Sequence, residues 1–154
     1  MSLAVELADE AATRRLGARL AGLVGEGDLI ALHGGLGAGK TTLARGLVSA
    51  LMGTETEVVS PTFTLVQVYE TPTVTVWHFD LYRLEAPEDL AELGWQEAEH
   101  GVALVEWPGH AGRHLPAWRL DLTLEHDGNG RIAHLEPHGE DWQKRLHGFQ
   151  FRSS

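Results

Sequence analysis

Apolar residues recur every three or four positions in three stretches of the chain, and this period predicts helices. The first stretch, residues 9–24, has one apolar face, which consists of Ala12, Leu16, Leu20, Leu23 and Val24. Asp9 is a suitable N-cap for this helix, and Gly25 ends it. A second helix is expected over residues 40–52, with an apolar stripe made of Leu43, Leu47, Val48 and Leu51. A third is expected over residues 140–147.

Shorter apolar or alternating runs predict strands. Two of these runs are almost entirely apolar and predict buried strands, Asp28–His33 and Val102–Glu106. Paired runs rich in β-branched, aromatic or alternating residues predict two hairpins, Phe63–Tyr69 with Val74–Phe79 and Arg119–Glu125 with Arg131–Leu135. Between the hairpins, Pro87–Leu93 predicts a short helix with the proline in its first turn. Because strand, helix and hairpin signals interleave, the sequence predicts an α/β protein with a mixed sheet.

Composition narrows the class of protein without changing this picture. A chain of 154 residues fits one domain, which we expect to span residues 1–154 with a core at about 9–147 and a loose tail at 148–154. The formal charge is −10, and an acidic chain is a poor binder of nucleic acid by itself. There is no cysteine, no secretory signal and no apolar run long enough to cross a membrane. We therefore expect a cytoplasmic protein without a membrane or DNA partner.

Candidate chemistry is concentrated in the glycine-rich segment between the first buried strand and the second helix. Residues 34–41 read GGLGAGKT and fit the phosphate-binding pattern G-x-x-x-x-G-K-[ST]. The glycines let backbone N–H groups point at phosphate oxygens, and the following helix adds the positive end of its dipole. Lys40 would meet the β and γ phosphates, and the Thr41 hydroxyl would ligate Mg²⁺. The sequence therefore predicts a three-layer P-loop NTPase-like domain, whose mixed sheet has a parallel centre and antiparallel hairpins at its edges.

Three further features bear on nucleotide choice and catalysis. GTPases commonly read guanine with an Asn-Lys-x-Asp element, and Asn129, the one asparagine here, precedes a glycine, so ATP is favoured. Asp80 follows one predicted strand and Glu106 ends another, where a carboxylate can hold Mg²⁺ or orient an attacking water. The alternative for both is a solvated acid at a strand end. Ser60 and Thr62 flank a proline after the P-loop helix, a pattern that fits either a switch segment or a simple turn.

Four segments in a fixed order closely resemble one protein family. LHGGLGAGKTTLARGL, SPTFTLV, HFDLYR and LVEWP, taken together, resemble the TsaE (YjeE) family over about Asp9 to Arg131. These proteins are bacterial P-loop ATPases needed to form threonylcarbamoyladenosine at adenosine 37 of tRNAs that read codons beginning with adenine. The resemblance implies an ATP-hydrolysing component that acts with the proteins TsaB and TsaD and meets tRNA only through these partners.

The resemblance also implies which residues bind the nucleotide. The phosphates would be held by one continuous segment, Leu36, Gly37, Ala38, Gly39, Lys40 and Thr41, followed by Thr42 of the same motif. Glu10, at the start of the first helix, and Arg131, after the turn of the second hairpin, match two further nucleotide-contacting positions. ATP and Mg²⁺ are the implied ligands.

The same resemblance implies the catalytic set. Lys40, Asp80 and Glu106 would be catalytic, and the two acids are open as alternatives for the direct Mg²⁺ ligand beside Thr41. Trp107, next to Glu106, matches a position that matters for activity. Ser60 and Thr62 match the switch-like segment of the family.

One residue departs from the family pattern. Gly35 stands where the family usually carries an acid, which puts in doubt any role of that acid in metal positioning or partner contact. Nucleotide binding should survive, because the N–H groups of the loop and Lys40 remain. Trp95 is a further residue of interest, either as core packing or as part of a partner-facing surface.

Two other functions are compatible with the phosphate loop. A small-molecule kinase would need an acceptor pocket and an arginine over the phosphates, for which Arg83 and Arg113 are the candidates, although no lid-like segment stands out. A nucleotide-gated binding module with negligible hydrolysis would depend on Lys40 and not on Glu106.

Overall fold

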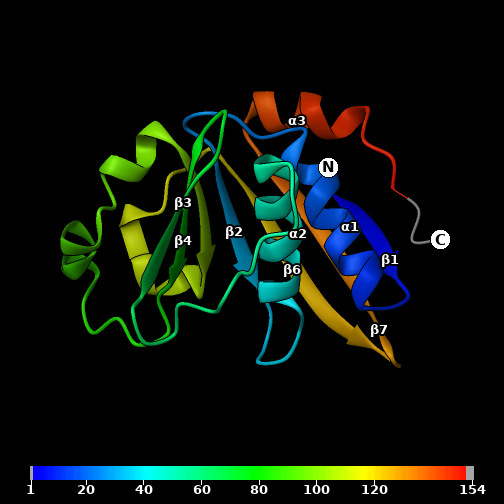
Figure 1. Ribbon diagram of the computed structural model, residues 1–154, viewed down its shortest axis with the longest axis horizontal. Helices are drawn as coiled ribbons and strands as arrows, with labels where there is room; N and C mark the ends of the chain where they lie inside the picture. Colours follow the sequence, from blue (N-terminus) through cyan, green and yellow to red (C-terminus); the bar gives the residue numbers. More distant parts are fainter. Residues whose placement is uncertain (1, 152–154) are drawn as a thin grey trace.

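The computed structural model describes residues 2–151, whose strands form one seven-stranded sheet (Figure 1). The strands follow the order β1-β7-β6-β2-β5-β4-β3. Their bounds are Leu3–Leu7 (β1), Leu29–His33 (β2), Val66–Glu70 (β3), Thr75–Asp80 (β4), Val102–Glu106 (β5), Arg119–Asp127 (β6) and Gly130–His138 (β7). Strands β6, β2, β5 and β4 are parallel, whereas β3, β7 and β1 join through antiparallel pairs. The prediction of a mixed sheet with a parallel centre and antiparallel edges is confirmed.

Three α-helices pack on one face of this sheet, namely α1 (Glu10–Ala21), α2 (Lys40–Met52) and α3 (Glu140–His147) (Figure 1). Asp9 caps α1 as expected, because its carboxylate accepts a hydrogen bond of 2.8 Å from the Ala12 N–H. The apolar stripes of these helices meet the inward residues of β2, β6 and β7 in the larger of two hydrophobic cores. No helix within residues 2–151 is long and apolar enough to cross a membrane.

Two glycines set how closely α1 and α2 approach. A Cβ on Gly17 would lie 2.1 Å from the Leu43 carbonyl oxygen, and a Cβ on Gly46 would lie 2.0 Å from the Arg14 carbonyl oxygen. These separations leave no room for any side chain, so the two helix backbones are in direct contact. The contact fixes the position of α2, whose first residue is Lys40.

The opposite face of the sheet is covered by short 3₁₀ helices, η1 (Pro87–Leu93), η2 (Glu97–His100) and η3 (Pro108–His114). They enclose the second core, which includes Phe79, Leu81, Ala103 and Val105. The helix expected at residues 87–93 is therefore present, but with 3₁₀ geometry. Trp77 and Trp95 pack against this core, and Trp95 also contacts Phe79 at 5.0 Å between ring centroids.

Several sequence expectations were wrong. Helix α1 ends at Ala21 and not at residue 24, and β6 and β7 extend to Asp127 and His138, beyond the predicted ends at residues 125 and 135. Leu3–Leu7 was not expected to form a strand, yet β1 pairs along β7 and buries Val5 and Leu7. The first hairpin strand begins at Val66 rather than Phe63, because Leu65 adopts a left-handed φ of 68° that breaks the extended backbone. The tail is not loose from residue 148, since Phe149 is buried in the larger core. Residues 152–154 of that tail lie outside the described residues.

Candidate nucleotide site

The phosphate loop connects the end of β2 with the start of α2. Gly34, Gly37 and Gly39 have φ values of 139°, 76° and 105°, which side chains rarely adopt. Gly39 is the N-cap of α2 and has no side chain that competes for the first N–H groups of the helix. These groups remain donors for an anion, and the helix dipole favours negative charge at the same place.

Gly35 differs from the other glycines of the loop. A Cβ at this position would meet no atom within 4 Å, and its φ lies outside the left-handed region. The backbone therefore does not require glycine here, and the acid that the family pattern carries would fit. Glycine in place of that acid therefore changes the charge beside the loop and leaves the shape of the loop unchanged.

Lys40 is buried, and its Nζ donates a hydrogen bond of 2.7 Å to the Gly34 carbonyl oxygen. The same ammonium lies 4.2 Å from the centroid of the Trp107 ring. Burial lowers the pKa of Lys40, and the negative charges of Glu106 and Asp80 oppose that change. Loss of hydration is the larger of these two effects. The negative charge of a bound phosphate would add to that of the two carboxylates and would further stabilise the charged form of Lys40.

The register of the sheet places Asp80 directly beside Glu106, at the carboxyl ends of the parallel strands β4 and β5. Asp80 is 4 % exposed and Glu106 is 3 % exposed, so neither is the solvated acid that spacing alone allowed. A buried carboxylate is costly unless it is hydrogen-bonded. Both carboxylates have such partners, and the partners differ.

The carboxylate of Asp80 is held by the segment that resembles a switch. Its Oδ2 accepts hydrogen bonds from the hydroxyls of Ser60 at 3.4 Å and Thr62 at 3.3 Å, and these hydroxyls lie 2.9 Å apart. Its Oδ1 accepts a third bond of 3.0 Å from the Tyr82 N–H. The Ser60–Thr62 segment is therefore linked directly to a carboxylate of the site, which a simple turn before a strand would not require.

The carboxylate of Glu106 is held by His78. His78 Nε2 lies 2.6 Å from Glu106 Oε2, and the histidine side chain is fully buried. An ionised carboxylate can only accept a hydrogen bond, so Nε2 carries the proton in this pair. The other nitrogen, Nδ1, is buried without a hydrogen-bond partner among the described residues. His78 is the first residue of the HFDLYR segment, and the structure shows that it contacts Glu106.

Trp107 connects the site to the surface. It is one of two residues other than glycine with a positive φ among residues 2–151, at 57°, and such strain is common at functional sites. One contact of its ring is with the Lys40 ammonium, and another is with the ring of Tyr82, at 5.0 Å between centroids. Tyr82 is half exposed, so this pair reaches from the buried lysine to solvent.

One cavity of about 310 Å³ brings most of the expected site residues together. It is lined by residues of the loop, the switch-like segment and the two strand ends, namely Leu36, Gly37, Ala38, Gly39, Lys40, Thr41, Thr42, Ser60, Thr62, Asp80, Glu106 and Trp107. Two expected residues lie outside this lining. Arg131 donates to the carbonyl oxygens of Gly37 and Ala38, each at 3.0 Å, and so supports the loop from behind. Glu10 is exposed in the first turn of α1.

The donor set fits Mg²⁺ bound together with a phosphate better than a metal held by protein alone. Among residues 2–151 no cluster of three or more His, Cys, Asp or Glu side chains could hold a metal ion. Mg²⁺ does not need one, because it keeps several waters and takes one or two protein oxygens with substrate phosphates. The Thr41 hydroxyl and a carboxylate of Asp80 or Glu106 supply oxygens of this kind.

Comparison with known proteins agrees with this geometry. A family model described as "Threonylcarbamoyl adenosine biosynthesis protein TsaE" matches residues 7–133. The protein named tRNA threonylcarbamoyladenosine biosynthesis protein TsaE from Rickettsia felis is 43 % identical over 131 residues, which are 84 % of this chain and 77 % of the relative. The protein of the same name from Nostoc sp. is 44 % identical over 137 residues, 85 % of this chain and 83 % of the relative.

The fold has a counterpart among solved structures. The crystal structure of Bacillus subtilis YdiB superposes with a TM-score of 0.81 at 28 % sequence identity, covering 96 % of this chain and 93 % of that one. The match of the family model extends from the end of β1 into β7 and includes every residue that lines the nucleotide cavity. On these grounds the chain belongs to the TsaE family.

Proposed function

We propose that this chain is an ATPase that serves the formation of threonylcarbamoyladenosine in tRNA. The observation that carries the proposal is the pairing of Asp80 with Glu106 across β4 and β5, in one cavity with the lysine of a phosphate loop. The names of its relatives give the pathway, and the cavity gives the chemistry that the chain would contribute to it.

ATP would bind with its phosphates along the loop. The N–H groups at the start of α2 and the ammonium of Lys40 would stabilise the negative charge of the β and γ phosphates. Charge moves onto the β phosphate as the P–O bond between the two groups breaks. Mg²⁺, when bound through Thr41 and a carboxylate, would add further positive charge to these oxygens. The chain's own contribution is a set of donors from the loop, the start of α2 and Lys40, which line one cavity.

Glu106 is the acid best placed to orient the attacking water. Its carboxylate has one oxygen held by His78, and this bond fixes the orientation of the group. Asp80, in contrast, accepts three hydrogen bonds from its own side of the cavity. We assign Asp80 to the metal and to the switch-like segment, and Glu106 to the water.

The surroundings of the cavity suit a protein whose nucleotide state is read by partners. Three large hydrophobic residues near the cavity are exposed, namely Leu36, Phe63 and Tyr82. Leu36 lines the cavity, Phe63 follows the lining residue Thr62, and the ring of Tyr82 contacts that of Trp107. Ser60 and Thr62 join the same region to Asp80. Partners that bind here would respond to loss of the γ phosphate. We propose TsaB and TsaD as these partners, with tRNA bound through them and the cytoplasm as the location.

The test is ATP hydrolysis by the purified chain, with and without TsaB and TsaD from the same source. We expect slow release of ADP and phosphate by the chain alone and a several-fold increase with both partners. The Glu106→Gln variant should bind the partners with ATP and release no phosphate above background. Transfer of the γ phosphate to a small molecule would show a kinase instead. Partner binding that needs ATP, with no hydrolysis by the wild-type chain, would show a gated binding module.

A further inference from the structure

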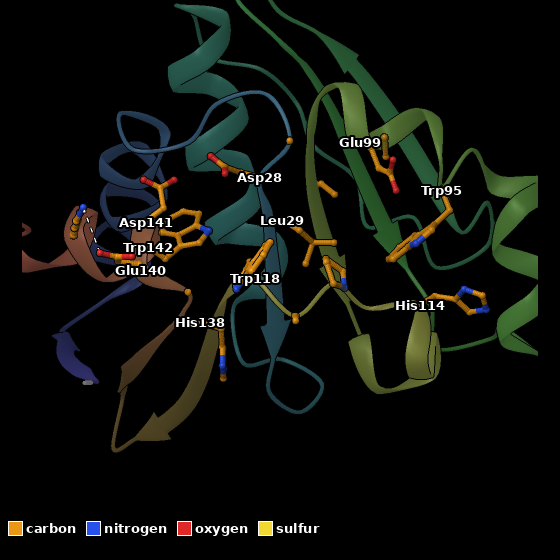
Figure 2. Close-up of a pocket in the computed structure, with 17 residues that line it drawn as sticks. Asp28, Leu29, Trp95, Glu99, His114, Trp118, His138, Glu140, Asp141 and Trp142 are labelled. Atoms are coloured by element: carbon orange, nitrogen blue, oxygen red, sulfur yellow. Dashed lines mark ion pairs between the residues drawn. The ribbon is translucent and has the colours of Figure 1, made fainter.

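A larger cavity lies at the end of the sheet opposite the phosphate loop. Its volume is about 850 Å³, and its floor includes Leu29 and Ala103, near the amino ends of β2 and β5. The nucleotide cavity lies at the carboxyl ends of the same strands. Three tryptophans line the larger cavity, Trp95, Trp118 and Trp142, and we call it the tryptophan cavity (Figure 2).

Trp118 is the unusual member of this set. It is 79 % exposed, whereas Trp142 is 3 % exposed and belongs to the core. Figure 2 shows Trp118 in the middle of the cavity, with Trp142 to one side and Trp95 to the other. The edge of the Trp118 ring packs so closely on Gly139 that a Cβ there would lie 2.7 Å from it. A large ring that is held in place and still open to solvent is typical of an anchor for a protein partner.

Two residues of the cavity lining, Trp142 and Asp28, already hold an arginine of the chain itself. The guanidinium of Arg145 lies 4.4 Å from the centroid of the Trp142 ring and donates to both carboxylate oxygens of Asp28, at 2.6 and 3.2 Å. It also contacts the carboxylate of Asp141. The hydrogen bonds that Arg145 donates to Asp28 are the main cause of the raised pKa of Arg145. Ring, guanidinium and carboxylate together form a complete arginine site within the chain.

The open part of the cavity holds the same kinds of group, but they are spread over it. Trp118 supplies an exposed ring, and Figure 2 shows Glu99 near Trp95 on one side of it and Glu140 beyond Trp142 on the other. Glu99 forms no ion pair with another described residue. Glu140 is paired with Lys144 at 3.6 Å, but both side chains are at least three-quarters exposed, so water and salt weaken the pair. Both acids favour a cation in the space over Trp118, and they would repel a phosphate ligand.

We propose that the tryptophan cavity is a docking site for a protein partner that inserts an arginine from an exposed segment onto Trp118. The partner's guanidinium would stack on the ring, where the negative charges of Glu99 and Glu140 attract it, while neighbouring apolar atoms cover Leu29 and Ala103. This surface is separate from the nucleotide site, and the proposal does not depend on ATP hydrolysis.

The experiment is selection of a displayed random-peptide library on the full wild-type chain, with removal of peptides that also bind Trp118→Ala. Because Trp118 is mostly exposed, this variant should unfold at the wild-type temperature and bind a fluorescent ADP analogue normally. Val68→Ala is the matched control, since Val68 is another exposed apolar residue, on the edge strand β3. We expect the selected peptides to be enriched in arginine and to bind Val68→Ala as they bind wild type.

One selected peptide, synthesised with arginine or with neutral citrulline, then tests the chemistry. Citrulline should weaken binding roughly 10-fold, and Glu99→Gln with Glu140→Gln should weaken it to a similar degree. Lys144→Ala should strengthen binding about twofold, because it frees Glu140. Enrichment of acidic or purely apolar peptides, no enrichment at all, or equal binding of the citrulline peptide would overturn the proposal. So would self-association of the chain that Trp118→Ala abolishes, because the occupant would then be a second copy.

Discussion

The nucleotide cavity and the tryptophan cavity occupy opposite ends of β2 and β5 and are built in different ways. The nucleotide cavity is the smaller, about 310 Å³ against 850 Å³, and it holds a buried lysine between two buried carboxylates. Backbone from one continuous loop forms much of its lining. The tryptophan cavity is formed by side chains from the ends of several strands and helices, and its charged groups lie at the rim. The comparison teaches that the amount of empty space does not indicate where the chemistry is.

The difference also separates how each cavity should respond to substitution. When a charge buried in the nucleotide cavity is removed, water cannot take over its interactions. Such a substitution should therefore have a large effect on ATP binding or hydrolysis. Groups on the rim of the tryptophan cavity are hydrated in the free protein, and their removal should change recognition by small factors.

The largest effect is expected from Glu106→Gln. The amide keeps the size of the side chain but cannot accept a proton or orient water as a carboxylate does, so ATP hydrolysis should fall by roughly 10³-fold. Binding of a fluorescent ATP analogue should change by less than about threefold. Hydrolysis and binding measured on the same preparation check this. Hydrolysis near the wild-type rate would remove Glu106 from its proposed role.

Lys40→Ala should weaken ATP binding roughly 100-fold, because the loop loses its charged donor while its N–H groups remain. Titration with the fluorescent analogue measures the affinity. Lys144→Ala, at the rim of the other cavity, is the matched control, since it removes the second of the two lysines and should leave ATP affinity unchanged. Equal losses in the two variants would mean that overall charge, and not the site, determines affinity.

His78→Leu should lower hydrolysis roughly 10-fold at saturating ATP, the usual size of an effect that acts through a neighbouring group. His78→Gln should restore part of the rate, because its amide can still donate to Glu106. A purely structural role for His78 would instead lower the unfolding temperature in both variants without a difference in rate between them. Thermal unfolding and hydrolysis are therefore measured together.

Asp121, in β6, should affect ATP least, because its substitution acts on stability instead. Burial raises the pKa of its carboxyl, but hydrogen bonds from His33 at 2.9 Å and Arg119 at 3.1 Å outweigh burial and bring the pKa to about 2. Its other oxygen lies 2.7 Å from Nε2 of His138, which lines the tryptophan cavity. Asp121 therefore joins the strand before the phosphate loop to the far cavity.

A carboxyl whose pKa is lower in the folded than in the unfolded chain stabilises the fold above about pH 4, and this contribution disappears as the pH falls towards 2. Asp121→Asn should therefore lower the free energy of unfolding by about 2 kcal/mol at pH 7. The difference between variant and wild type should shrink between about pH 4 and pH 2. Urea unfolding across this range checks it, and a difference independent of pH would show that packing, not charge, is responsible.

The sequence by itself determined the elements that depend on local order along the chain. The bounds of α2, β5 and α3 agree with the predicted ranges, because caps, glycines and hydrophobic periods act over neighbouring residues. The phosphate loop was equally readable, since its function resides in consecutive backbone groups. In contrast, β1 is five residues long, and the short alternation of Leu3, Val5 and Leu7 becomes a strand only beside β7.

Only the tertiary structure decided which side chains meet. The hydrogen bond between His78 and Glu106 joins the neighbouring strands β4 and β5. The close contact of α1 with α2 at Gly17 and Gly46 depends on how the two helices cross. The tryptophan cavity is likewise assembled from residues more than a hundred positions apart, such as Leu29 and Trp142. Such contacts are set by sheet register and helix packing, which involve residues distant in the chain. The sequence therefore specified where we propose that phosphates bind, and the fold specified how the carboxylates around that place are held.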